Sequence, residues 1–209
     1  ASMLSGPAAW DPETRQISSL PRGVESDRLP DEICEVGPRD GLQNEKRLVS
    51  IEDKLRFIDL LACAGFREIE ATSFVSPKWV PQLADAEEVL PRAIAAHPST
   101  LFSVLVPNEK GLERALACGA RKVSVFTAAS EGFTRKNINA TIAESIERWA
   151  AVGDAARAAG KKTSVTIAAS FGCPFEGRVD PALVVDIARQ LAATKPDEIG
   201  LADTIGVAV

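Results

Sequence analysis

Leu101–Thr127, LFSVLVPNEKGLERALACGARKVSVFT, contains a strand, a helix and a second strand. Its two ends, Leu101–Val106 and Lys122–Thr127, are short runs rich in apolar and β-branched residues. Between them, Asn108–Gly119 has apolar residues at helical spacing, a capping residue at its start and a glycine at its end. This arrangement predicts a βαβ unit with two parallel strands.

The same alternation continues through the rest of the chain from residue 31. Further strand-like runs lie at Glu32–Val36, Glu68–Phe74, Thr163–Ala169 and Glu198–Ala202. Repeated βα units predict an α/β fold with a parallel sheet, here a TIM barrel. A (β/α)8 barrel has eight strands and typically about 250 residues, so we expect 31–209 to supply about six of the eight units. An open barrel would leave strand edges unpaired, which favours a domain incomplete at its C-terminus.

Capping residues, glycines and prolines predict where the helices begin and end. A proline inside a helix removes a backbone hydrogen bond, so Pro91 is expected to kink or split the segment Val80–Ala96. The expected boundaries are a start at Ser50 with Asp53, an end at Gly65, a start at Asp180 with Pro181, and a longest helix over Asn139–Gly160.

The composition excludes several classes of protein. The 209 residues are 45% hydrophobic with a formal net charge of −5, which argues against a nucleic-acid surface. No apolar run approaches the roughly 18 residues of a membrane span. Four scattered cysteines indicate free thiols in a reducing compartment, the cytoplasm or, in a eukaryote, the mitochondrial matrix. Residues 1–30 are rich in Pro, Ser and Gly and are expected to form a loosely ordered tail.

Polar residues gather where the predicted strands end, which is where parallel α/β folds place their sites. The stretch EVGPRDGLQNE places Arg39 and Asp40 just after the first strand, while Glu70 lies in the second and Asp203 follows the sixth. One strand-end carboxylate is usually structural, but three carboxylates at one end of the barrel, partly shielded from water, would repel one another. Either a bound cation or a bridging arginine resolves that repulsion. A divalent metal on Asp40 would stabilise an enolate or alkoxide.

Five motifs together resemble the 3-hydroxy-3-methylglutaryl-CoA (HMG-CoA) lyase family of metal-dependent TIM-barrel enzymes. They are GPRDGLQNE, IEATSFVSPKWVPQ, SEGFTRKNIN, GCPFEG and DTIGV, in the family's order. The resemblance implies cleavage of HMG-CoA to acetyl-CoA and acetoacetate, as in leucine degradation, with Mg²⁺ or Mn²⁺. It implies an acyl-CoA as partner and is compatible with a homodimer.

The resemblance also implies roles for the matching positions. Asp40 becomes a metal ligand, Arg39 the charge near the thioester and enolate oxygens, and Glu70 a supporting carboxylate. Asp203 becomes the candidate for proton transfer at the substrate hydroxyl. The implied substrate-binding residues are Gln43, Lys136 and Asn137.

The chain departs from the family in its metal ligands. The family completes its site with two histidines of an HxH motif and an asparagine on later strands, whereas His97 is the only histidine here. We therefore expect 31–209 to be part of a larger lyase and the chain alone to have little activity. Three alternatives remain open: a condensing synthase of the isopropylmalate or homocitrate type, a catalytically inactive CoA-binding protein, and a second chain that supplies the last strands.

The remaining conspicuous residues have structural interpretations. Trp79, in the loop after the second strand, is expected to pack against that loop. Cys173 follows the fifth strand, but the family's catalytic cysteine lies in another loop, so no catalytic role is carried over to it. His97 is expected to be structural, and the core is expected to contain Cys34, Cys63 and Cys118.

Overall fold

A computed structural model describes residues 10–11, 16–17 and 33–208. The first two of these stretches form a small antiparallel pair, β1 (Trp10–Asp11) and β2 (Gln16–Ile17), which the sequence did not predict. Apart from these four residues, the expected tail over 1–30 lies outside the described residues, as does its boundary with the barrel domain.

Six parallel strands form one curled sheet, in which each strand pairs with its neighbours in the chain. This consecutive order is that of a half-barrel, and it confirms the predicted βα repeat. All six strands lie where the sequence predicted them, to within one or two residues at either end. They are β3 (Cys34–Glu35), β4 (Glu68–Ser73), β5 (Leu101–Leu105), β6 (Lys122–Ala128), β7 (Lys162–Ala168) and β8 (Glu198–Leu201).

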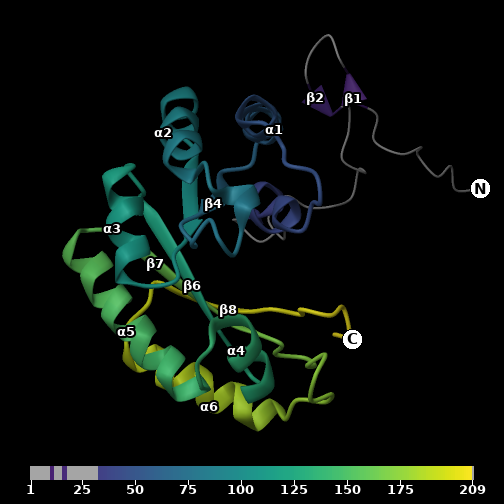
Figure 1. Ribbon diagram of the computed structural model, residues 1–209, viewed down its shortest axis with the longest axis vertical. Helices are drawn as coiled ribbons and strands as arrows, with labels where there is room; N and C mark the ends of the chain where they lie inside the picture. The colour runs from purple at the N-terminus through teal and green to yellow at the C-terminus, as the bar shows by residue number, and fades with distance from the viewer. Residues whose placement is uncertain (1–9, 12–15, 18–32, 209) are drawn as a thin grey trace, which may run out of the picture.

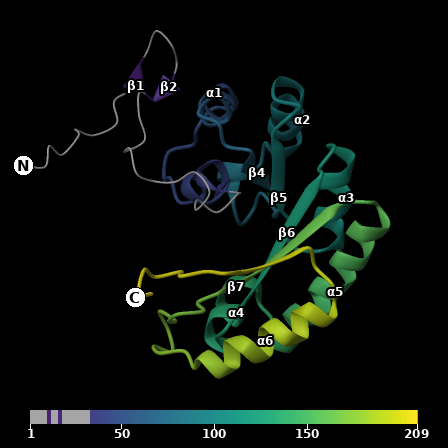
Figure 2. The ribbon, with the colours of Figure 1, turned by 180° about the vertical axis from the view of Figure 1, so that it is seen from behind.

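Helices cover the convex side of the sheet. Five of them follow one another in an arc around the strands in both views (Figures 1 and 2). They are α1 (Ile51–Cys63), α2 (Ala86–Ala96), α3 (Glu109–Ala117), α5 (Ile142–Ala158) and α6 (Pro181–Ala193).

The predicted caps are present. The Ser50 side chain accepts the Asp53 amide at the start of α1, and the Asp180 side chain accepts the amide of Ala182 at the start of α6. Gly65 follows α1 with a positive φ of 98°, the left-handed conformation expected after a helix.

The start of the longest helix was predicted wrongly, and Pro91 does not split its segment. The long helix does not begin at Asn139, because an unpredicted helix, α4 (Glu131–Ile138), ends there with Asn139 in the left-handed region at φ 49°. Helix α5 then begins after Thr141, which forms a capping box with Glu144. Pro91 lies inside α2 without ending it. The break in its segment falls earlier, between the turn η3 (Pro81–Leu83) and Asp85.

The two faces of the sheet have different chemistry. Side chains that face the helices are mostly apolar and buried, as at Ile69, Val104 and Val165. The alternate positions face the concave side and are more often polar; in β4 and β6 they include the buried Glu68 and Lys122.

One buried ion-pair cluster joins alternate strands at their first residues. The Lys122 ammonium of β6 lies 2.9 Å from the Glu68 carboxylate of β4 and 2.5 Å from that of Glu198 in β8. Burial alone would lower the pKa of Lys122, but the two carboxylates outweigh it and raise the pKa. This cluster forms the layer at the amino ends of the strands, so the site residues lie on the opposite rim.

Candidate functional site

The site begins in a tight π-helical turn, η2 (Gly37–Gly41), directly after β3. The carbonyl of Val36 accepts the amides of both Arg39 and Asp40, at 3.1 and 2.7 Å. A Cβ on Gly37 would lie 2.8 Å from the Glu35 carboxylate and 3.2 Å from the Phe57 ring, so a side chain there would displace the carboxylate that accepts the Gly37 amide at 2.7 Å. The GPRDG sequence thus fixes the backbone from which the two charged side chains project.

Arg39 bridges two of the three carboxylates identified in the sequence. Its Nε donates to Glu70 Oε2 at 2.5 Å, and its Nη1 donates to Asp40 Oδ1 at 2.7 Å. The two acids differ in environment, because the Glu70 side chain is 7% exposed and that of Asp40 is 57% exposed. Of the two ways to relieve the carboxylate repulsion, a bridging arginine is the one this arrangement contains.

Ser124 completes the setting of Glu70. Its hydroxyl donates to Glu70 Oε1 at 2.6 Å. Ser124 lies on β6, on the concave side of the sheet. Both carboxylate oxygens of this buried acid therefore have a hydrogen-bond partner, which fixes the side chain beside Arg39. Sequence reasoning missed Ser124. The signal was its alternate position in the strand, on the same face as Lys122.

Asp203 follows β8, but its carboxylate turns toward its own backbone. Oδ1 accepts the amide of Val207 at 3.0 Å, and Oδ2 accepts the amide of Ala208 at 2.8 Å. These backbone hydrogen bonds hold the pKa of Asp203 below its ordinary value. None of the described contacts joins Asp203 to Arg39 or Glu70, so the structure brings together two of the three acids.

The proposed substrate-binding residues lie on two strand-end elements. Gln43 is half-buried and directly follows the π-helical turn. Lys136 and Asn137 are exposed on α4, which follows β6. The Lys136 ammonium lies 3.7 Å from the centre of the Phe175 ring, and Asn137 Nδ2 donates to the Phe133 carbonyl at 3.0 Å.

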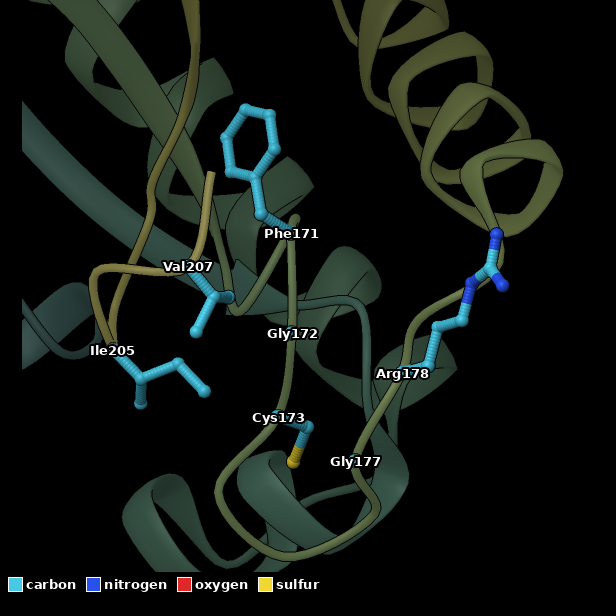
Figure 3. A pocket seen from close by; sticks show the side chains of 7 residues that line it. All are labelled: Phe171, Gly172, Cys173, Gly177, Arg178, Ile205 and Val207. Carbon is cyan, nitrogen blue, oxygen red and sulfur yellow. The ribbon is translucent and has the colours of Figure 1, made fainter. Parts of the chain in front are cut away.

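A pocket of about 340 Å³ lies between the loop after β7 and the segment after β8. Ile205 and Val207 point toward the backbone at Gly172, while Arg178 extends toward the start of α6 (Figure 3). A Cβ on Gly172 would lie 2.8 Å from the Val207 side chain, so glycine allows the two segments to approach. The pocket wall is mostly apolar and contains none of the charged site residues.

Of the three acids of the site, Asp40 is the one with a carboxylate oxygen open to a metal ion. One oxygen of Asp40 is paired with Arg39, and the exposed side chain leaves the other oxygen free to coordinate. In the part of the chain that the structure describes, no group of three His, Cys, Asp or Glu side chains is spaced to hold a metal. Asp40 therefore fits a single ligand position, and a complete coordination shell needs further ligands.

Other residues singled out in the sequence differ from expectation. Trp79 does not pack on its loop, because it is 84% exposed. Two of the predicted core cysteines, Cys34 and Cys63, are in exposed positions. Cys34 lies on the edge strand β3, yet its thiol faces inward, where burial and the Glu68 charge raise its pKa to about 12. Cys173 is buried.

The fold and the site define a parallel α/β half-barrel with a charged cluster at the carboxyl ends of its strands. The profile of the HMGL-like family matches residues 31–209. The chain belongs to this family. Among the helices described above, none combines the length and apolar character needed to cross a bilayer.

The relatives that match this chain include HMG-CoA lyases. The mitochondrial hydroxymethylglutaryl-CoA lyase of Rattus norvegicus is 50% identical over 93% of this chain and 57% of its own length. The Pseudomonas aeruginosa lyase superposes with a TM-score of 0.81 at 47% identity, over 85% of this chain and 59% of its own. The Acinetobacter baumannii lyase, solved with coenzyme A and 3-methylmalate, gives 0.80 at 35% identity, over 85% and 58%. The chain thus spans somewhat more than half of these relatives.

Proposed function

We propose that this chain carries the strand-end site of a carbon–carbon lyase that cleaves HMG-CoA to acetyl-CoA and acetoacetate. The observation that supports this most is the Arg39 guanidinium, held between a buried and an exposed carboxylate at the end of β3. Membership of the HMGL-like family and the names of the relatives support the same reaction.

The reaction needs a positive charge where negative charge develops. Loss of the C3 hydroxyl proton lets the C2–C3 bond break; C3 becomes the ketone of acetoacetate, and the electron pair moves to the thioester as an enolate that is then protonated at C2. Arg39 would stabilise the enolate oxygen. Glu70, fixed by Ser124, would keep the guanidinium oriented before substrate binds.

A divalent metal, Mg²⁺ or Mn²⁺, is part of this proposal, with Asp40 as one ligand. When bound, such an ion supplies Lewis-acid stabilisation of developing oxygen charge. The contribution of this chain is the placement of Asp40. Its backbone is fixed by the Val36 carbonyl, and one oxygen is oriented by Arg39.

Asp203 is proposed as the acceptor of the hydroxyl proton, under one condition. Its carboxylate accepts two backbone amides, which disfavour its protonated form. To act as a base, it has to release at least one of these bonds when substrate binds. Gln43, Lys136 and Asn137 are proposed to bind the acyl-CoA.

Two competing functions can be distinguished from the lyase by the substrates that the protein turns over. A condensing synthase of the same superfamily would use acetyl-CoA and a 2-oxoacid, and an inactive CoA-binding protein would turn over neither substrate. A cytoplasmic or mitochondrial-matrix location and a homodimer stay predictions; fractionation and native mass measurement test them.

The deciding experiment is an assay of acetoacetate release. The full-length protein, supplied with Mg²⁺ or Mn²⁺ and HMG-CoA, is expected to release acetoacetate. The Arg39→Met variant is expected to lose about 10²–10³ in kcat, as for removal of one oxyanion-stabilising donor. Activity with only a 2-oxoacid and acetyl-CoA would point instead to the synthase.

A further inference from the structure

The loop after β7, residues 171–177, makes three contacts with helix α4, although some forty residues separate them in the sequence. It first touches the residue that caps the helix. Cys173 Sγ lies 2.9 Å from Ser130 Oγ, and Ser130 Oγ accepts the amide of Phe133 at 3.1 Å. The loop is itself closed by paired backbone hydrogen bonds between Cys173 and Gly177, at 2.8 and 2.9 Å.

Glu176 makes the second contact, at the first turn of the helix. Its Oε1 accepts the amide of Gly132 at 2.6 Å, one of the amides that a helix start leaves without an internal partner. A Cβ on Gly132 would lie 2.7 Å from the same oxygen, so glycine gives the carboxylate room. A carboxylate is also the charge that the amino end of a helix favours.

Phe175 makes the third contact, farther along the helix. Its ring centre is 6.1 Å from that of Phe133, and the Lys136 ammonium lies 3.7 Å from its centre. Phe175 remains 48% exposed, so this contact lies at the surface of the protein. The position of the Lys136 charge thus depends on a residue of the next loop.

We infer that Phe175 and Glu176 are positioning residues that set the orientation of α4 and place the Lys136 ammonium for a phosphate of the substrate's nucleotide. This rests on the proposed function, which makes Lys136 a contact to an acyl-CoA. Glu176 fixes the start of the helix, and Phe175 holds the lysine side chain in one region of space. A lysine held before binding loses less side-chain entropy when it meets a phosphate.

The test compares two thioesters of the same acyl group in the full-length protein. HMG-CoA contains the nucleotide phosphates, whereas the N-acetylcysteamine thioester lacks them. Phe175→Leu is expected to raise KM for HMG-CoA about two- to fivefold, the effect of losing an exposed cation–π contact. Its kcat, and its KM for the truncated thioester, should stay as in the wild type. Phe175→Trp should restore KM.

Glu176→Ala should likewise raise KM for HMG-CoA alone, and Glu176→Gln, which keeps an acceptor oxygen, should raise it less. Phe171→Leu is the matched control, because Phe171 is 46% exposed in the same loop. Any effect of this control should be equal for the two thioesters.

Equal changes for both thioesters in Phe175→Leu, or no change, would overturn the inference. If the wild type turns over neither thioester, the proposed function has failed, and calorimetric titration with CoA decides the inference separately. A weaker Kd for CoA in Phe175→Leu than in the wild type supports it. An equal Kd, or no CoA binding by the wild type, rejects it.

Discussion

Removing the guanidinium of Arg39 should expose how strongly the site depends on charge pairing. Glu70 is buried and accepts from Arg39 at 2.5 Å, so Arg39→Met leaves a buried carboxylate without its counter-charge. Breaking a buried ion pair in this way costs about 3–5 kcal/mol. Ser124 still donates to the other oxygen, which favours the lower part of that range.

The matched change is Glu70→Gln, which keeps the shape and an acceptor oxygen for Ser124 but removes the charge. In the wild type it should destabilise, because Arg39 loses its buried partner. In the Arg39→Met background it should stabilise, because the unpaired buried charge is gone. Urea unfolding of the four proteins in this double-mutant cycle measures the coupling. The reasoning is refuted if Glu70→Gln has the same effect in both backgrounds, to within about 0.5 kcal/mol.

Three further predictions concern the frame around the site. Lys122→Met should lower the free energy of urea unfolding by about 3–5 kcal/mol, because it leaves Glu68 buried without its cation, and adding Glu68→Gln should recover part of that loss. Asp197 has a pKa held below its ordinary value of 3.8 by a backbone amide of β7, so the stability it contributes is present above about pH 4 and lost as the pH falls through its lowered pKa. Thermal unfolding across this range should show a smaller loss in Asp197→Asn, and an unchanged acid profile would count against the assignment. Gly37→Ala should cost about 0.5–1.5 kcal/mol in urea unfolding, because its Cβ would displace the Glu35 carboxylate and break the hydrogen bond from the Gly37 amide; a stability equal to the wild type would mean that the turn relaxes freely.

Hydrophobic pattern and spacing were enough to predict the sheet. A strand buried on both faces appears in the sequence as a short run of mostly apolar residues. Two neighbouring parallel strands need a connecting helix, so β5, α3 and β6 could be located from one stretch. The helix caps were also predictable, because their hydrogen bonds join residues that are close in the sequence. The Ser50 cap needs only a backbone amide three residues ahead.

Helix α4 was missed because it is short and part of its stabilisation comes from a distant segment of the chain. Its sequence, EGFTRKNI, has only two large apolar residues, Phe133 and Ile138, so its periodicity is weak. Its first turn is held by Glu176, which lies 44 residues away from Gly132. Contacts of that separation leave no periodic trace in a single sequence.

The candidate site was predictable in its chemistry and only partly in its geometry. The pairing of Arg39 with Glu70 follows from two strand ends that are adjacent in the sheet. The contribution of Ser124 depends on which face of β6 looks inward, a matter of strand register. The Asp203 carboxylate accepts hydrogen bonds from backbone amides four and five residues farther along its own turn, and not from the other site residues.

The measurement that tests the central claim most directly is acetoacetate release from HMG-CoA by the full-length protein and its Arg39→Met variant, with the folded state of both checked by circular dichroism. The account predicts release by the wild type and a loss of about 10²–10³ in kcat in the folded variant. A wild type that releases no acetoacetate, or a folded variant that retains the wild-type kcat, would contradict it.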